Sequence, residues 1–294
     1  MEKINHSLLY LSYGRGIHED EVIFSILTAA HRDGLASRGI EIFVYTDHPE
    51  SFTSLPATIH HVPTEQWDSW SGPSGFNHRR KILALQDCLD RTNRPTVLLD
   101  GDTWWRRPAS EIFDRIGPGR SVMHLREGII HQTRSSKAEA MADFLCSHTF
   151  FDPVGKEVSF EPSSTMWNAG VIGIHPADRA LLDEVLHWTD QFCQHGNLHV
   201  LEQFAFSQVL SRRTRLSESG DLVFHYWPPY LHDPFRRRLS AIMAAGRDLP
   251  LAERARHCYA FRPRPGFPRR CKVVLKRILQ GLGLLRGRIR TNEW

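Results

Sequence analysis

The chain has 294 residues, of which 41% are hydrophobic, and α/β folds often reach this length as one domain with a full core. Its formal net charge is +4, but residues 262–290 contain ten Lys or Arg and no acid, which leaves a net charge of −6 for the rest. Binding to a nucleic-acid backbone requires a basic surface, so this charge distribution argues against nucleic-acid binding by everything outside that segment.

The cysteine content and the lengths of the apolar runs indicate where in the cell the protein is located. The five cysteines are an odd number without a C-x-x-C pair, which favours a reducing cytosol over a disulfide framework or a zinc site. The N-terminus lacks the apolar stretch of a signal peptide. The sequence contains no run of 18 consecutive apolar residues, which is about the length needed to span a membrane. We therefore expect a cytoplasmic protein, soluble or peripheral at the inner membrane.

The first 46 residues predict a β-α-β unit. Residues 8–11 form a buried-type strand, 12–16 a polar loop, and the apolar spacing that follows is helical as far as Ala30. Residues 40–45 read as the second strand, ending in a Thr-Asp-His-Pro turn.

Beyond this unit, residues 47–75 are polar and are predicted to form a mobile excursion. Helical spacing resumes at 81–89, and residues 95–99 form a buried strand that ends on Asp100. Further strands are expected at 121–125, 168–174 and 222–226, and helices at 181–192 and 202–210. We predict a catalytic domain over 1–260 and a basic helical tail over 261–294.

Asp100-Gly101-Asp102 is the strongest candidate for a site. Ligands of open α/β sheets bind outside the carboxyl ends of the strands, which is where this tripeptide falls. Two carboxylates two residues apart can face one hard cation, Mn²⁺ or Mg²⁺, and Gly101 allows the backbone to approach closely. The alternative is a solvated turn, because Asp-Gly is common in turns.

His225 is the candidate third ligand of this cation. It ends the strand-like run 222–226, and a neutral imidazole suits Mn²⁺. Since the chain has 17 histidines, most of them must be structural or solvated, and it is the strand-end position that distinguishes His225.

The run Val97-Leu98-Leu99-Asp100-Gly101-Asp102 resembles the hydrophobic strand and DxD signature of GT-A glycosyltransferases. The order of motifs over the first 230 residues is similar to the retaining galactosyltransferase and glycogenin-like families. Those motifs are Ser12-Tyr13, Lys81, the DxD, Trp167-Asn168-Ala169-Gly170-Val171, Glu202-Gln203 and His225.

The resemblance implies a GT-A fold, with a Rossmann-like nucleotide-binding sheet flanked by helices, and a role for each matching residue. Asp100, Asp102 and His225 would hold the metal, and Gly101 would lie against the donor between the two carboxylates. Ser12 and Tyr13 would approach the nucleotide, and Lys81 the donor. The sugar would be faced by Asn168, Ala169, Gly170, Glu202 and Gln203, with Asn168, Glu202 and Gln203 nearest the reaction.

The implied activity is transfer of a sugar from a nucleotide-diphosphate sugar, with UDP favoured, to a hydroxyl of a glycan or lipid-linked acceptor, as in surface polysaccharide synthesis. The resemblance favours retention of anomeric configuration. An inverting enzyme would need a carboxylate base, for which Glu202 and Asp221 are candidates. After His225 the chain lacks the Gly and Lys of the family pattern His-x-x-Gly-x-x-Lys-Pro-Trp, and Arg236, Arg237 or Arg238 is a substitute for the missing positive charge.

In the predicted tail, residues 269–285 place apolar and basic side chains on opposite arcs of a helix. This pattern is typical of an anchor on an anionic membrane surface, and equally of a C-terminal helix packed on the body.

Two other functions remain open from the sequence. One is a catalytically silent protein that keeps the fold and binds glycan or membrane. The other is a haloacid-dehalogenase-type phosphatase, although that family has Thr two residues after the second Asp, where this chain has Trp104.

Overall fold

The computed structural model of the chain describes residues 5–32, 34–133 and 135–264. The α-helices are α1 (Ile17–Arg32), α2 (Thr64–Ser71), α3 (Arg79–Thr92), α4 (Ser110–Phe113), α5 (Ser136–Ser147), α6 (Leu181–His195), α7 (Leu201–Arg213), α8 (Pro229–Gly246) and α9 (Leu251–Ala260). Four short 3₁₀ helices are formed by Leu35–Arg38, Pro49–Phe52, Ile130–Gln132 and Pro176–Asp178.

A seven-stranded sheet forms the centre of the molecule, in the order β12-β6-β11-β4-β1-β2-β3. Its strands are β1 (His6–Ser12), β2 (Ile40–Thr46), β3 (Thr58–His61), β4 (Thr96–Leu99), β6 (Arg120–Met123), β11 (Val171–Ile174) and β12 (Arg215–Glu218). Neighbouring strands are parallel except that β11 is antiparallel to both β4 and β6. This mostly parallel sheet between helices confirms the predicted α/β class and is compatible with a Rossmann-like fold.

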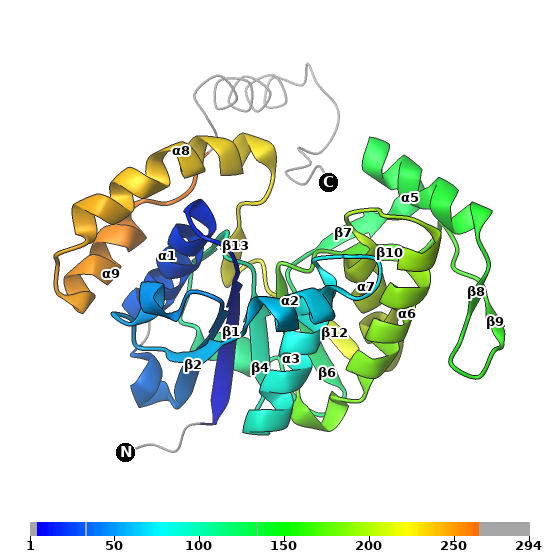
Figure 1. Ribbon diagram of the computed structural model, residues 1–294, viewed down its shortest axis with the longest axis horizontal. Helices are drawn as coiled ribbons and strands as arrows, with labels where there is room; N and C mark the ends of the chain where they lie inside the picture. Colours follow the sequence, from blue (N-terminus) through cyan, green and yellow to red (C-terminus); the bar gives the residue numbers. More distant parts are fainter. Residues whose placement is uncertain (1–4, 33, 134, 265–294) are drawn as a thin grey trace, which may run out of the picture.

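Helices cover the two faces of the sheet (Figure 1), with α1, α8 and α9 over one and α2, α3, α6 and α7 over the other. Alternate residues of one strand therefore enter different cores. Leu8 and Tyr10 of β1 pack with α1, whereas Leu9 packs on the opposite side. Because both faces are buried, β4 is apolar from Val97 to Leu99, and polar side chains gather at the strand ends.

Three antiparallel ribbons lie outside the main sheet. β5 (Thr103–Trp105) pairs with β13 (Val223–His225), and β7 (Arg126–Ile129) pairs with β10 (Thr165–Trp167). β8 (Phe150–Phe151) and β9 (Glu157–Val158) form a hairpin beside α5 and α6 (Figure 1). The first two ribbons extend from the carboxyl edge of the sheet and carry predicted site residues.

Two expectations from the sequence are wrong in detail. Residues 47–75 are not an irregular excursion, since they form a 3₁₀ helix, the edge strand β3 and helix α2, in which Trp67 is 2% exposed. Residues 168–174 are not one strand, because Asn168, Ala169 and Gly170 form the connection between β10 and β11. In both cases single buried residues and local turns interrupt a pattern that looks uniform in sequence.

The last described helix, α9, ends at Ala260, where the sequence places the end of the catalytic domain. The predicted amphipathic helix at 269–285 lies outside the described residues. Among the helices of the described ranges, none is both long and apolar enough to cross a membrane.

Candidate metal centre and substrate cleft

A cleft of about 680 Å³ opens where β1 and β4 end. The order β3-β2-β1-β4 is that of a mononucleotide-binding half of the doubly wound fold, in which ligands bind at the point where the strand order reverses. The residues to which the family resemblance assigns a role all line this cleft: Ser12, Tyr13, Lys81, Asp100, Gly101, Asp102, Asn168, Ala169, Gly170, Glu202, Gln203 and His225.

The Asp-Gly-Asp segment is a fixed turn between β4 and β5. The backbone N–H of Thr103 donates to the Gly101 carbonyl at 2.8 Å, and the Thr103 hydroxyl donates to the Asp100 carbonyl at 2.9 Å. Helix α1 packs directly against it, because a Cβ built on Gly101 would lie 2.9 Å from Val22 Cγ2. Glycine at position 101 is therefore required by close packing, and the turn holds both carboxylates at the cleft.

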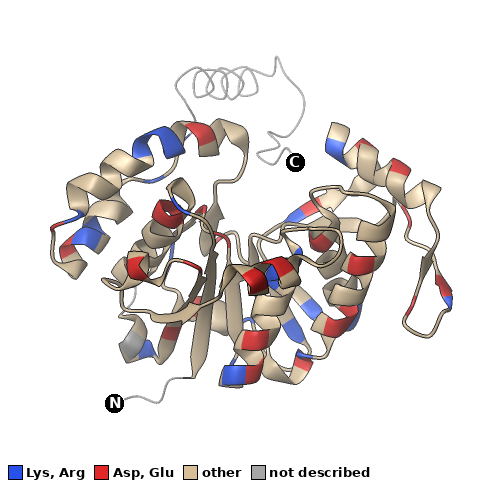
Figure 2. Ribbon diagram, viewed as in Figure 1, with Lys and Arg blue, Asp and Glu red and all other residues tan. Residues whose placement is uncertain are grey.

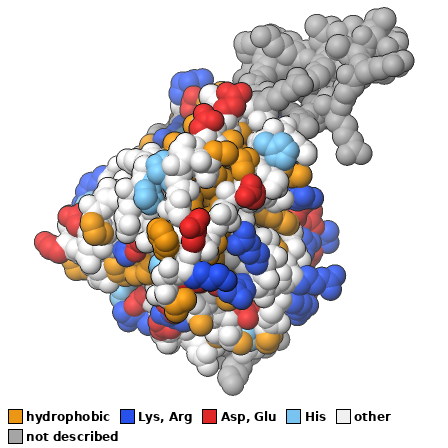
Figure 3. Space-filling model, turned by 90° about the vertical axis from the view of Figure 1, so that its right-hand side faces the viewer, with side chains coloured by type: hydrophobic (Ala, Val, Ile, Leu, Met, Phe, Trp, Pro, Cys, Tyr) orange, Lys and Arg blue, Asp and Glu red, His pale blue; other side chains and the backbone are white. Residues whose placement is uncertain are grey.

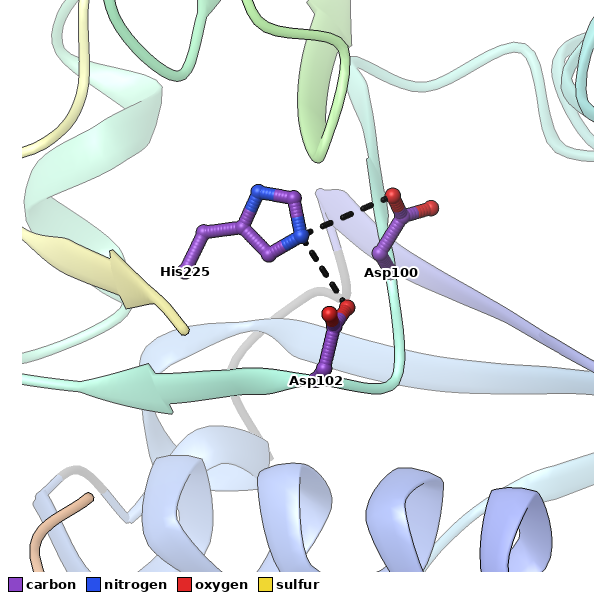
Figure 4. Close-up of side chains that lie close together, drawn as sticks. All are labelled: Asp100, Asp102 and His225. Atoms are coloured by element: carbon purple, nitrogen blue, oxygen red, sulfur yellow. Dashed lines mark hydrogen bonds and ion pairs between the residues drawn. The ribbon is translucent and has the colours of Figure 1, made fainter. Parts of the chain in front are cut away.

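The ribbon of β5 and β13 brings His225 to these carboxylates (Figure 4). Because His225 pairs with Thr103 in the ribbon, its imidazole stands beside Asp102 although 122 positions of sequence separate the two pairing residues. His225 Nε2 lies 3.0 Å from Asp102 Oδ1 and 3.8 Å from Asp100 Oδ2. Burial acts to lower the pKa of His225, but the neighbouring Asp102 carboxylate outweighs it and raises that pKa above its ordinary value.

Asn168 fixes the orientation of the imidazole. Its Oδ1 accepts from the Gly170 N–H at 3.0 Å and lies 2.8 Å from His225 Nδ1, while its Nδ2 donates to Glu127 Oε1 at 3.0 Å. These partners make Oδ1 the acceptor, so the proton is on Nδ1 and Nε2 is directed at the carboxylates. An outer hydrogen bond of this kind is how metal-binding histidines are usually oriented.

The residues present fit a hard divalent cation. Asp100, Asp102 and His225 offer two carboxylates and one imidazole, with ligand atoms all within 4.8 Å of one another. Carboxylate oxygen with imidazole nitrogen suits Mn²⁺, and the carboxylates alone suit Mg²⁺. Gly170 leaves room for the histidine, since a Cβ there would lie 2.1 Å from His225 Nδ1.

A buried lysine stands beside the metal-ligand cluster. Lys81 Nζ lies 2.7 Å from Asp100 Oδ1 and 3.8 Å from Glu202 Oε1. Burial acts to lower the lysine pKa, and the Asp100 and Glu202 carboxylates raise it overall, so the amine stays charged. Glu202 is 3% exposed, burial raises its pKa, and its Oε2 has no hydrogen-bond partner among the described residues.

On the other side of the cleft, helix α8 brings a second group of charges, built around Glu21. This buried carboxylate lies 2.6 Å from Arg236 Nη2, 3.1 Å from His232 Nε2 and 3.5 Å from His18 Nδ1. Burial acts to raise the pKa of Glu21, and the hydrogen bonds from these neighbours lower it well below its usual range. Hydrogen bonding to Glu21 raises the pKa of His232.

Glu127 is the most informative residue that the sequence reasoning missed. Besides Asn168, it accepts a hydrogen bond from Gln203 Nε2 at 2.8 Å, and burial raises its pKa to about 7. It follows the predicted strand 121–125, so the strand-end rule that singled out Asp100 would also have found Glu127. His18, Glu21 and His232 had no comparable signal, because they belong to helices.

Two further expectations from the sequence concern Asp221 and the arginines of α8. Asp221 is not a base at the cleft, since its carboxylate pairs with Arg115 at 2.6 Å on the surface, outside the residues that line the cleft. Of the three arginines considered in place of the missing lysine, Arg236 lines the cleft, whereas Arg237 and Arg238 are exposed elsewhere on α8.

Comparison with protein-family models gave no match, and comparison with curated proteins gave none either. The function is therefore argued from the chemistry of the cleft.

We expect Gly170→Ala to weaken Mn²⁺ binding by at least about tenfold, because the added methyl group displaces the His225 ring while leaving every ligand in the sequence. Calorimetric titration with Mn²⁺ measures this. Gly196→Ala is the matched control, since its Cβ meets only the Phe144 ring, at 3.2 Å. Equal affinities of the two variants would contradict a metal centre at His225.

The raised pKa of Glu127 predicts a pH-dependent stability. A pKa of about 7 in the folded chain, above the ordinary 4.5, means that Glu127 costs nothing below pH 4.5 and destabilises the fold progressively as the pH rises to 7. Against Glu127→Gln, the wild-type free energy of unfolding should fall by up to about 3 kcal/mol over this window. Urea unfolding in EDTA at several pH values measures this free energy for both proteins. If the two curves of free energy against pH ran parallel, the pKa of Glu127 would not be raised, which would contradict the prediction.

Proposed function

We propose that the chain is a metal-dependent glycosyltransferase with a GT-A fold, which transfers a sugar from a nucleotide-diphosphate sugar to a hydroxyl group. The observation that carries this proposal is the cluster of Asp100, Asp102 and His225 at the strand-order reversal, inside a cleft with a cationic group on either side.

The charges support a diphosphate as ligand. Lys81 lies on one side of the metal-ligand cluster, and Arg236 and His232 lie on the other, with His232 Nε2 4.0 Å from Asp102 Oδ2. Arg236 is oriented by Glu21 and lines the cleft, so we propose that it supplies the positive charge of the lysine that the family pattern has and this chain lacks. When bound, Mn²⁺ or Mg²⁺ would neutralise negative charge that develops on the leaving diphosphate.

The wall formed by Glu127, Asn168, Glu202 and Gln203 supports a site for the transferred sugar. Hydrogen bonds connect Glu127 to both amides, so these side chains are held before a ligand arrives. The free Oε2 of Glu202 is a buried acceptor that a sugar or acceptor hydroxyl would satisfy. Ser12, at the end of β1, also has a buried hydroxyl without a partner among the described residues, and it lines the cleft beside Tyr13 as a nucleotide contact would.

In the proposed reaction the bond from the anomeric carbon to the diphosphate oxygen breaks, and a bond to the acceptor oxygen forms. In the retaining course the acceptor proton passes to the leaving phosphate, and the protein contributes position and electrostatics. Both oxygens of Glu127 already accept amide hydrogen bonds, which leaves Glu202 as the cleft carboxylate with a free oxygen. NMR of the fresh product decides the course, because an inverted anomeric centre would assign Glu202 the role of base.

Turnover of UDP-, GDP- and CDP-sugars with Mn²⁺ tests the proposal directly. We expect one donor to release its nucleoside diphosphate, EDTA to stop the release, and Asp102→Asn to reduce it by at least about a hundredfold, because the metal ligand and its charge are lost. Asp143→Asn, an exposed change on α5, serves as control. No turnover, with no metal-dependent nucleotide binding, would instead favour a catalytically silent binding protein.

Arg236→Gln should weaken binding of the nucleoside diphosphate by about tenfold to a hundredfold, since a charged hydrogen bond to phosphate is lost. The affinity for nucleoside monophosphate and for Mn²⁺ alone should change little. Calorimetry on this variant and on the exposed neighbour Arg237→Gln measures the difference. An equal loss for monophosphate and diphosphate would place Arg236 away from the second phosphate.

A further inference from the structure

A ladder of arginines and aromatic rings lies on the α1 and α9 side of the molecule. The Arg32 guanidinium stacks on Tyr259 at 5.1 Å, Tyr259 stacks on Trp104 at 4.9 Å, and Arg262 covers Trp104 at 5.4 Å. Arg262 also lies 5.8 Å from the Phe224 ring, which Arg106 covers at 4.7 Å. We call these six residues, from α1, β5, β13, α9 and the segments after β5 and α9, the arginine ladder.

Among the described residues, the nearest acidic influence on the ladder is Asp221, whose charge acts on Arg106 without forming an ion pair with it. None of the ladder's three arginines forms an ion pair within the part of the chain that the structure describes. Arg32 Nε instead donates to the Arg106 carbonyl at 3.1 Å, and both burial and the charge of Arg262 lower the pKa of Arg106. Arg32 and Arg262 are exposed, and so is Arg256, whose charge acts on the neighbouring His31.

The positive charges of the ladder stand out against the negative net charge of the chain outside residues 262–290. The chain outside residues 262–290 has a net charge of −6, and on the opposite side acidic and basic side chains are interspersed (Figure 3). Figure 2 shows further basic positions on α8 and α9, the helices nearest the ladder. Guanidinium groups that are held in place by aromatic rings can bind an external anion, because the planar guanidinium of Arg donates two parallel hydrogen bonds to a phosphate.

We propose that the arginine ladder binds the phosphate groups of an anionic phospholipid surface. The chain reaches the ladder at Arg262, and the sequence from there to position 290 adds nine more Lys or Arg and no acid, so it carries charge of the same sign as the ladder. The apolar residues within that segment suit a lipid bilayer rather than a nucleic acid. This surface is independent of the proposed transferase activity.

Arg32 of the ladder lies the length of helix α1 from the cleft, whereas Trp104 and Phe224 stand in the β5–β13 ribbon that also carries His225. His18 and Glu21 at the start of this helix face the cleft, whereas Arg32 at its end belongs to the ladder, and at 1.5 Å per residue they are about 20 Å apart.

The test is binding of the full chain to vesicles of phosphatidylcholine with and without phosphatidylserine. The triple variant Arg32→Gln, Arg106→Gln, Arg262→Gln should bind the anionic vesicles about a hundredfold more weakly, at about fivefold for each arginine. The control triple, Lys156→Gln, Arg212→Gln and Arg215→Gln, removes the same charge from exposed positions at the β8–β9 hairpin, α7 and β12. It should bind as the wild type does.

The three ladder positions changed to Lys give a second variant that keeps the charge and loses the planar fork. We expect intermediate binding, and thermal unfolding of each variant shows whether the fold is kept. If the Gln variant unfolds, weaker binding of the folded Lys variant still supports the ladder, and wild-type binding by it overturns the proposal. Equal loss in the control triple, or tighter binding of single-stranded DNA than of anionic vesicles, also overturns it.

Discussion

Burial of both faces of the central sheet is the constraint on which the rest of the structure depends. With α1, α8 and α9 on one side and α2, α3, α6 and α7 on the other, a strand such as β4 has no face open to solvent that could carry a charged side chain. Within the sheet, charged groups are therefore found at the strand ends, and the other charges of the cleft come from the ribbons and helices around it. The cleft lies at the carboxyl edge, where Ser12, Asp100 and Asp102 follow their strands, because it is the place left for them.

Within the cleft, charges are buried in groups that compensate one another. Lys81 offsets Asp100, Arg236 and His232 offset Glu21, and His225 offsets Asp102. Glu127 is the exception, since only amides contact it, and its pKa rises to about 7 as a result. A site arranged in this way is organised before any ligand binds, and preorganised charge is what transfer of an anionic leaving group requires.

Helix α1 connects the two features that we associate with function. Its first turns supply His18 and Glu21 to the cleft, its middle packs on Gly101, and its last residue, Arg32, begins the arginine ladder. The same helix therefore positions a turn of the candidate metal centre and a guanidinium on the surface. The β5–β13 ribbon makes a second connection, because it carries His225 of the cleft and the Trp104 and Phe224 rings of the ladder.

The sequence by itself determined the α/β class, the approximate ends of the main strands and the Asp100, Asp102 and His225 cluster, because burial on two faces makes strands apolar and leaves their polar ends visible. It missed α2 and the break at 168–170, where local packing interrupts the pattern. Only the tertiary structure brought Glu127 to Asn168, Arg236 to Glu21, and Arg32 to Tyr259. Those contacts depend on the register of β7 with β10 and on the docking of α8 and α9, and such pairings between distant segments leave no periodic signal in one chain.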